Sequence, residues 1–188
     1  MGSSDPSGGP FVVSRSATFF GVAGFFRKLF RLGVLPDALR AELEPEGILA
    51  VFENIKVHYR FSGHVPGLIS ALEVRAYSGS LIVTGTRLAG TLSVLPGSAG
   101  RAVNVPWTTG DDGAVHLTID ESGVHIAIDL ARVSPSEFTG TQSLEYLQPF
   151  SPELLAQIPK KSFGFDIPRE YALRLAGVPV RPPKQPKA

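Results

Sequence analysis

The chain has 188 residues, of which 43% are hydrophobic, and it carries a formal net charge of +1. This length is typical of one ordinary domain, and the hydrophobic content excludes a wholly disordered chain. The sequence contains no cysteine, which excludes disulfides, thiolate metal sites and cysteine nucleophiles and fits a reducing compartment.

The first 46 residues divide into a lead-in and a helical segment. Residues 1–17 are rich in Gly, Ser and Pro and predict a flexible lead-in, whereas residues 18–46 predict helices. On a helical wheel, apolar side chains of residues 18–32 fill one half and basic side chains lie opposite, with Phe20 as the apolar exception. A second short helix follows over residues 36–43.

The amphipathic helix is the strongest functional signal in the sequence. Its composition is suited to a membrane interface, but its apolar face could equally pack on its own sheet or on a partner chain. The candidate membrane- or partner-binding residues are Phe19, Phe25, Phe26, Arg27, Lys28, Leu29, Phe30 and Arg31.

The hydrophobic period changes to two after residue 46, and residues 47–160 predict one β domain with a closing helix. Short strands with Gly-containing turns and no helices between them favour an antiparallel sandwich or barrel of about seven to nine strands. The predicted strands are Ile48–Glu53, Lys56–Ser62, Ser70–Tyr77, Ser80–Thr86, Leu88–Leu95, Ala102–Trp107, Ala114–Ile119, Val124–Leu130 and Ser143–Phe150.

The clearest hairpin runs from residue 114 to residue 130. A loop at residues 120–123 pairs Ile119 with Val124 and continues with two more branched apolar pairs, so one face is buried. The other face carries His116, His125 and Asp129, which are weak candidates for a metal or acid/base site, because diagonal residues on a sheet stand about 7–8 Å apart. We otherwise expect no metal site, no cofactor and no catalytic residue.

The chain is expected to become helical again after residue 150. The start Ser151-Pro152-Glu153 is typical of a helix N-terminus, and a helix over residues 152–158 is the expected closing element of the β domain. Residues 161–188 predict a short helix at 168–176 and a basic, Pro-rich tail. From residue 160 to the last residue there are seven Lys or Arg and two acids, a net +5 that could attract an acidic membrane surface.

Two stretches resemble a known family. The run Phe25–Gly33 (FFRKLFRLG), with Leu35-Pro36 and Leu39–Ile48 (LRAELEPEGI) after it, resembles the opening of small actinobacterial proteins with a pleckstrin-homology-like, or GRAM-like, domain. The stretch Tyr77–Leu88 (YSGSLIVTGTRL) is similar to a hairpin of that group. The resemblance implies a PH-like sheet sandwich closed by a C-terminal helix, with a binding or adaptor role.

The leading hypothesis is therefore a non-enzymatic PH-like binding module that acts through protein contacts, either in the cytoplasm or peripherally at the inner face of the membrane. The alternatives are a β-barrel carrier of a small apolar ligand and an accessory subunit of a larger assembly. A metal-dependent enzyme built on the histidine pair is the least favoured hypothesis. We expect a protein partner, consider an anionic membrane surface or a homo-oligomer as further partners, and expect no nucleic acid.

Overall fold

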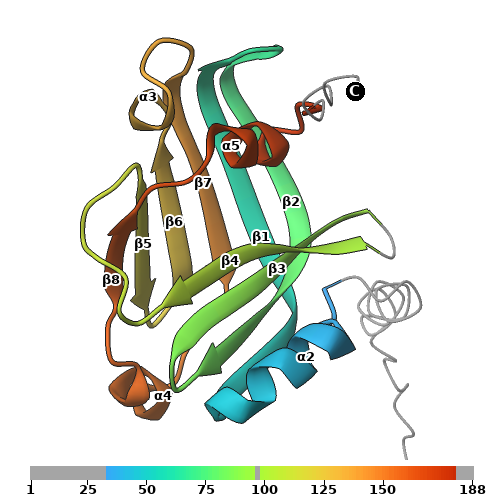
Figure 1. The fold of residues 1–188 in the computed structure, drawn as a ribbon. Coiled ribbons are helices and arrows are strands. Elements are labelled where there is room, and N and C mark those ends of the chain that lie inside the picture. The colour runs from blue at the N-terminus through green and yellow to red at the C-terminus, as the bar shows by residue number, and fades with distance from the viewer. Residues whose placement is uncertain (1–32, 96–97, 181–188) are drawn as a thin grey trace, which may run out of the picture.

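The computed structural model describes residues 33–95 and 98–180, except for the side chains of residues 94–100. Within these residues, eight antiparallel strands form one sheet in the order β4-β3-β2-β1-β7-β6-β5-β8. The sheet curls into a half-barrel, and Figure 1 shows β3 and β4 crossing in front of the strands at its centre. The half-barrel therefore has a concave face, a convex face and two edge strands, β4 and β8.

The elements have the following bounds. The strands are β1 (Ile48–Val65), β2 (Leu68–Thr84), β3 (Arg87–Leu95), β4 (Ser98–Pro106), β5 (Val115–Asp120), β6 (Gly123–Asp129), β7 (Thr139–Leu147) and β8 (Ser162–Phe165). The helices are α2 (Asp37–Leu43), the 3-10 turn η1 (Glu44–Glu46), α3 (Leu130–Val133), α4 (Pro152–Gln157) and α5 (Arg169–Leu175).

The prediction of a mainly β fold is confirmed, but two predicted turns lie inside long strands. The β1 strand joins the first two predicted strands through a bulge at Asn54, a non-glycine residue at φ 60°. The β2 strand joins the next two without a break at Ser78 and Gly79. Polar and small residues at these positions resemble a turn in sequence. Both strands nevertheless continue, because β1 and β2 pair with each other along their length.

The C-terminal elements partly match expectation. The α4 helix starts where Ser151 Oγ accepts a hydrogen bond from Leu154 N at 3.3 Å, and α5 occupies the predicted 168–176 region. The β8 strand between them was not predicted. Four residues give too little alternation for a pattern, and the strand is specified by its pairing with β5. Figure 1 shows α4 at one end of the half-barrel and α5 in front of its concave face.

The predicted register of the β5–β6 hairpin is confirmed. Ile119 pairs with Val124, and the neighbouring apolar residues pair as expected. Gly123 begins β6 at φ +141°, and a Cβ there would lie 2.0 Å from Tyr146 O on β7. Glycine therefore allows β6 to approach β7 at the turn.

Two hydrophobic clusters stabilise the sheet from opposite sides. The larger cluster fills the concave face. On the convex face, Leu35, Leu39 and Leu43 of the α2 region pack against Ile82 and Ala89. A fully buried leucine contributes about 1.5–3 kcal/mol, so α2 is held mainly by three side chains.

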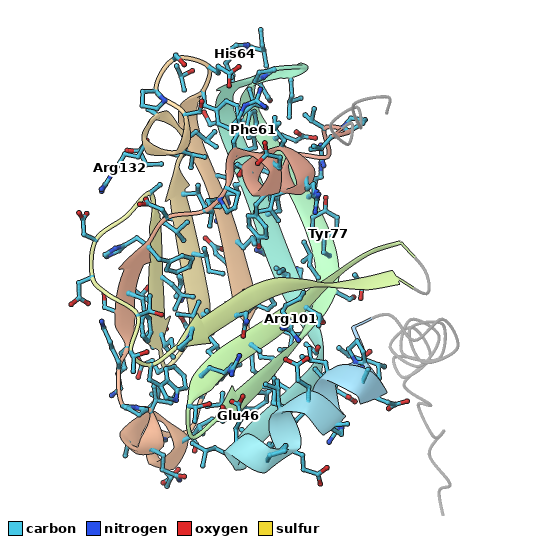
Figure 2. All side chains as sticks on the ribbon, viewed as in Figure 1. Glu46, Phe61, His64, Tyr77, Arg101 and Arg132 are labelled. Carbon is cyan, nitrogen blue, oxygen red and sulfur yellow. The ribbon has the colours of Figure 1, made fainter. Side chains whose placement is uncertain are left out.

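A polar network joins η1 to the β2–β3 turn. Glu46 accepts hydrogen bonds from Thr84 Oγ1 at 3.0 Å, from Thr86 Oγ1 and from Arg87 Nε at 3.0 Å (Figure 2). Trp107 Nε1 donates to Thr84 O at 3.0 Å, which connects the end of β4 to the same turn. The hydrogen bond from Thr86 is the main cause that lowers the pKa of Glu46 below its ordinary value of 4.5.

The substitution Glu46→Gln should weaken this network in a pH-dependent way. Because the pKa of Glu46 is lowered in the folded state, its stabilisation is present above about pH 4.5 and is lost as pH falls through the folded-state pKa. We expect urea unfolding at pH 7 to show a loss of about 1–2 kcal/mol, which shrinks toward pH 3. The control is Glu44→Gln, an exposed carboxyl in the same 3-10 turn. A loss that does not depend on pH would contradict the prediction.

Candidate functional site

The α5 helix lies across the concave face and is tied to three different strands. Tyr171 donates from its hydroxyl to Ala102 O on β4. Gln142 Nε2 on β7 donates to Ala172 O at 3.0 Å, and Arg75 on β2 donates to Ala176 O at 3.4 Å. A seven-residue helix has little stability alone, so these contacts and its buried apolar side chains hold it in place.

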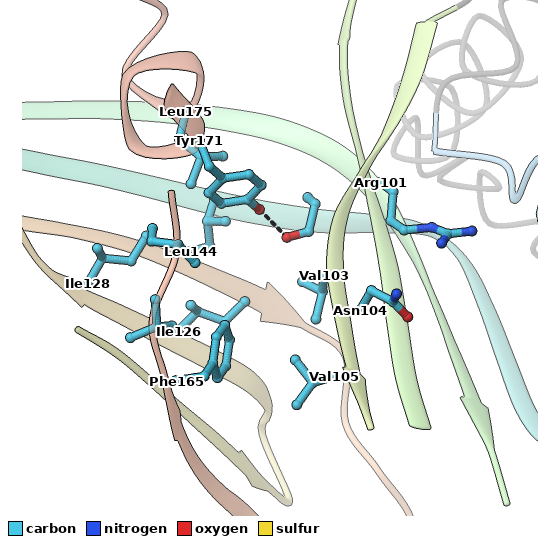
Figure 3. A pocket seen from close by; sticks show the side chains of 13 residues that line it. Arg101, Val103, Asn104, Val105, Ile126, Ile128, Leu144, Phe165, Tyr171 and Leu175 are labelled. Carbon is cyan, nitrogen blue, oxygen red and sulfur yellow. Dashed lines mark hydrogen bonds between the residues drawn. The ribbon is translucent and has the colours of Figure 1, made fainter. Parts of the chain in front are cut away.

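A cavity of about 210 Å³ lies between α5, the edge strand β4 and the strands β5 to β8. Figure 3 shows the side chains that converge on it from these elements. Most of its walls are branched or aromatic apolar side chains. Its lining consists of Arg101, Ala102, Val103, Asn104, Val105, Val115, Ile126, Ile128, Leu144, Phe165, Ile167, Tyr171 and Leu175.

The polar side chains of the lining are engaged elsewhere. The Arg101 guanidinium lies 2.7 Å from Glu42 Oε2, and Asn104 Oδ1 accepts from Arg87 at 3.3 Å. Both side chains point away from the cavity in Figure 3. The hydroxyl of Tyr171 is donated to Ala102 O, and burial raises the pKa of Tyr171 to about 12, so it is neutral at physiological pH. The cavity is therefore apolar and uncharged.

A polar cluster lies beneath α5, where Gln142 and Arg75 contact the carbonyls of Ala172 and Ala176. The ring of Tyr59 has the Arg75 guanidinium 5.5 Å from its centre, and Gln142 Nε2 lies 3.4 Å from its hydroxyl. Arg75 also pairs with Glu73 and donates to Tyr77 OH at 3.3 Å. Burial raises the pKa of Tyr59 to about 12. These contacts position α5 on the sheet.

The histidine hypothesis gains no support from the geometry. His116 pairs with Ala127 and Thr118 with His125, so the two histidines are diagonal neighbours as predicted. However, His125 Nε2 contacts Ser122 Oγ at 2.8 Å, and Asp129 Oδ1 accepts from Ala131 N at 3.0 Å as the N-cap of α3. In the described ranges, no group of three or more His, Asp or Glu could hold a metal ion.

The eight candidate residues of the amphipathic helix, residues 19 to 31, lie outside the described residues. Across the described part of the chain, no helix has the length and apolarity needed to cross a membrane. Sequence analysis missed an exposed apolar row on β2, where Ile69, Leu72 and Val74 are 79%, 65% and 58% exposed. The alternation of apolar and charged residues along β2 is visible in the sequence, but it does not show which face of the strand is exposed to solvent.

Sequence analysis also missed the cavity. Its residues come from β4, β5, β6, β7, β8, α5 and the segment before α5, and each apolar one individually has the pattern of an ordinary core position. Trp107 is buried against Phe163, with ring centres 5.9 Å apart, but neither residue belongs to the cavity lining.

The substitution Tyr171→Phe should loosen α5 without unfolding the sheet. It removes the hydrogen bond to Ala102 O and leaves the ring in place, at a cost of about 1 kcal/mol. We expect amides of α5 to exchange with deuterium about three to ten times faster, while those of β1 and β7 keep their rates. The control is Arg174→Ala, an exposed residue of the same helix. Unchanged exchange in α5 would show that this bond does not hold the helix.

Comparison with protein-family models, with curated proteins and with solved structures finds no match to this chain. The functional conclusion therefore depends on the chain's own features. These are the curled sheet, the α5 helix fixed across its concave face and the apolar cavity between them.

Proposed function

We propose that the protein is a binding module that holds a small, uncharged and mostly apolar molecule in the cavity beneath α5. The observation that carries this proposal is the cavity itself, a space of about 210 Å³ with apolar walls. The space is partly open to solvent, and removing its apolar walls from water by binding an apolar molecule is favourable. An engineered apolar cavity of about 150 Å³ binds benzene, which sets the scale for a ligand of one or two fused rings.

This proposal takes up the hypothesis of an apolar ligand carrier. The edge strand β4 supports it, because its Val103 and Val105 form one wall and strands β5 to β8 form the other. A ligand between them would bridge the two ends of the sheet. The PH-like identity of the curled sheet stays a prediction, as does a peripheral position at the membrane.

The hypothesis of a module that acts through protein contacts also stays a prediction. Among the described residues, such a module would depend on the exposed apolar row of β2, formed by Ile69, Leu72 and Val74. This row lies on a different part of the molecule from the cavity lining. The two activities are therefore separable by substitution.

The test of the proposed function is the binding of indole, a neutral two-ring probe, measured by calorimetry and by shifts of methyl NMR signals. We expect a Kd between about 10 µM and 1 mM, as is usual for so few atoms. Shifts should concentrate on Val103, Ile126 and Leu144. The substitution Val103→Phe should fill the cavity and weaken binding at least about tenfold.

The control for Val103→Phe is Ala127→Phe, which adds the same ring at an exposed position of β6. This variant should bind indole as the unmodified protein does. Absence of indole binding up to its solubility limit would overturn the proposed function. Equal loss of binding in both phenylalanine variants would place the site elsewhere.

A further inference from the structure

Three large apolar side chains form an exposed row on β2. Ile69, Leu72 and Val74 are 79%, 65% and 58% exposed. Leu72 and Val74 alternate with Glu73 and Arg75, and Arg75 reaches α5 on the concave side, so the row lies on the convex face. Single exposed apolar residues are ordinary on a protein surface, but a row of them along one strand indicates a contact surface.

The described chain begins on the same face, at the end of this row. Gly33 N donates to Ser93 Oγ at 3.0 Å, and Gly33 O accepts from Asn54 N at 2.8 Å. Ser93 of β3 is the cross-strand partner of Ser78 of β2, and a Cβ on Gly33 would lie 3.1 Å from Ser78 Cβ. Ser78 follows Val74 by four residues and therefore shares its face. Gly33 is thus fixed over β2, directly beside the exposed row.

The α2 region covers the other direction along β2. Its three buried leucines pack on Ile82 and Ala89 of the convex face. From α2 back to Gly33, the chain passes over β2 from the level of Ile82 to the level of Ser78. The next apolar surface in the same direction along β2 is the exposed row. The residues before Gly33 therefore start where this row begins.

The sequence before Gly33 fits the row in both length and pattern. Residues 18–32 predict an amphipathic helix with apolar side chains on one half and basic side chains on the other. A helix of this length measures about 22 Å. Along β2, the six residues from Ser78 back to Leu72 span about 20 Å. The apolar half of such a helix could cover the row while its basic half stays in water.

We propose that the exposed apolar row of β2 is the docking site of residues 18–32 of the same chain. The segment runs in the same direction as β2, with Phe19 close to Leu72 and its last residues close to Ser78. The sequence leaves three environments open for the apolar half of this segment, and the position of Gly33 favours its own sheet. The inference is independent of the cavity beneath α5, whose lining does not include the row.

The experiment measures deuterium exchange of the amides of residues 19–31 in the full chain, in a fraction that mass measurement shows to be monomeric. We expect these amides to exchange at least about tenfold more slowly than in a free peptide of the same sequence. The double substitution Leu72→Thr and Val74→Thr keeps side chains suited to a strand but places hydroxyls beneath the segment. It should remove most of this protection.

The matched control is Ala127→Thr, an exposed position of β6 on the same convex face, which should leave the protection unchanged. Exchange at the free-peptide rate in the unmodified monomer would overturn the inference. Protection that survives the double substitution would also overturn it, because the segment would then pack elsewhere. Protection that appears only in a dimer, or only with phosphatidylglycerol vesicles, would assign the segment to a second copy or to a membrane.

Cross-linking provides a second measurement that does not depend on the folding of the double variant. The chain contains no cysteine, so the pair Phe19→Cys and Leu72→Cys can be joined selectively by a short bismaleimide. We expect this pair to cross-link within one chain. The pair Phe19→Cys and Ala127→Cys should stay unlinked, although a tethered segment without a fixed site would reach both positions. Equal cross-linking of the two pairs would overturn the inference.

Discussion

An antiparallel sheet that curls without closing keeps an apolar concave face and two edge strands, and all of these must be covered or paired. In this protein the short helix α5 covers part of the concave face, and apolar residues of α3 and α4 join the same core. The α5 helix is tied to β4 by Tyr171, to β7 by Gln142 and to β2 by Arg75. These strands are not neighbours in the sheet order, so one helix connects separate parts of the curled sheet. The cavity is the space that remains where α5 spans the distance between β4 and the opposite strands.

The position of α5 also accounts for the unusual polarity of β2. Side chains of a strand alternate between the two faces, so Arg75 can reach α5 only if its neighbours face outward. Glu73 and Tyr77 accompany Arg75 on the concave side, whereas Leu72 and Val74 lie on the convex side and are exposed. The outward direction of Leu72 and Val74 thus follows from the inward direction of Glu73 and Arg75.

Local patterns predicted much of the fold and little of the site. The register of the β5–β6 hairpin was predictable, because three branched apolar pairs determine it. The continuity of β1 through Asn54 was not predictable. Asn54 has a positive φ, which is typical of a turn, and only the pairing with β2 on both sides shows that the strand continues. The short β8 strand depends on its pairing with β5 and on the bridge between Gly164 and Asp111.

The site was harder to predict for the same physical reason. The cavity walls come from five strands and one helix, and Gln142, which holds α5, lies outside the strand predicted at Ser143–Phe150. Its role comes from Ala172 O of α5, thirty residues later in the chain, which accepts a hydrogen bond from the Gln142 amide. His125, by contrast, was conspicuous in sequence but is engaged by a local contact with Ser122.

The placement of Trp107 gives the molecule an intrinsic optical reporter. It is the single tryptophan of the chain, it follows β4 directly, and its ring lies against Phe163 of the opposite edge strand β8. Its indole nitrogen is held by Thr84 O in a buried environment. Any change in the separation of the two edge strands alters the surroundings of this one fluorophore. Its emission wavelength and quenching by acrylamide therefore follow the opening of the half-barrel in the unlabelled protein.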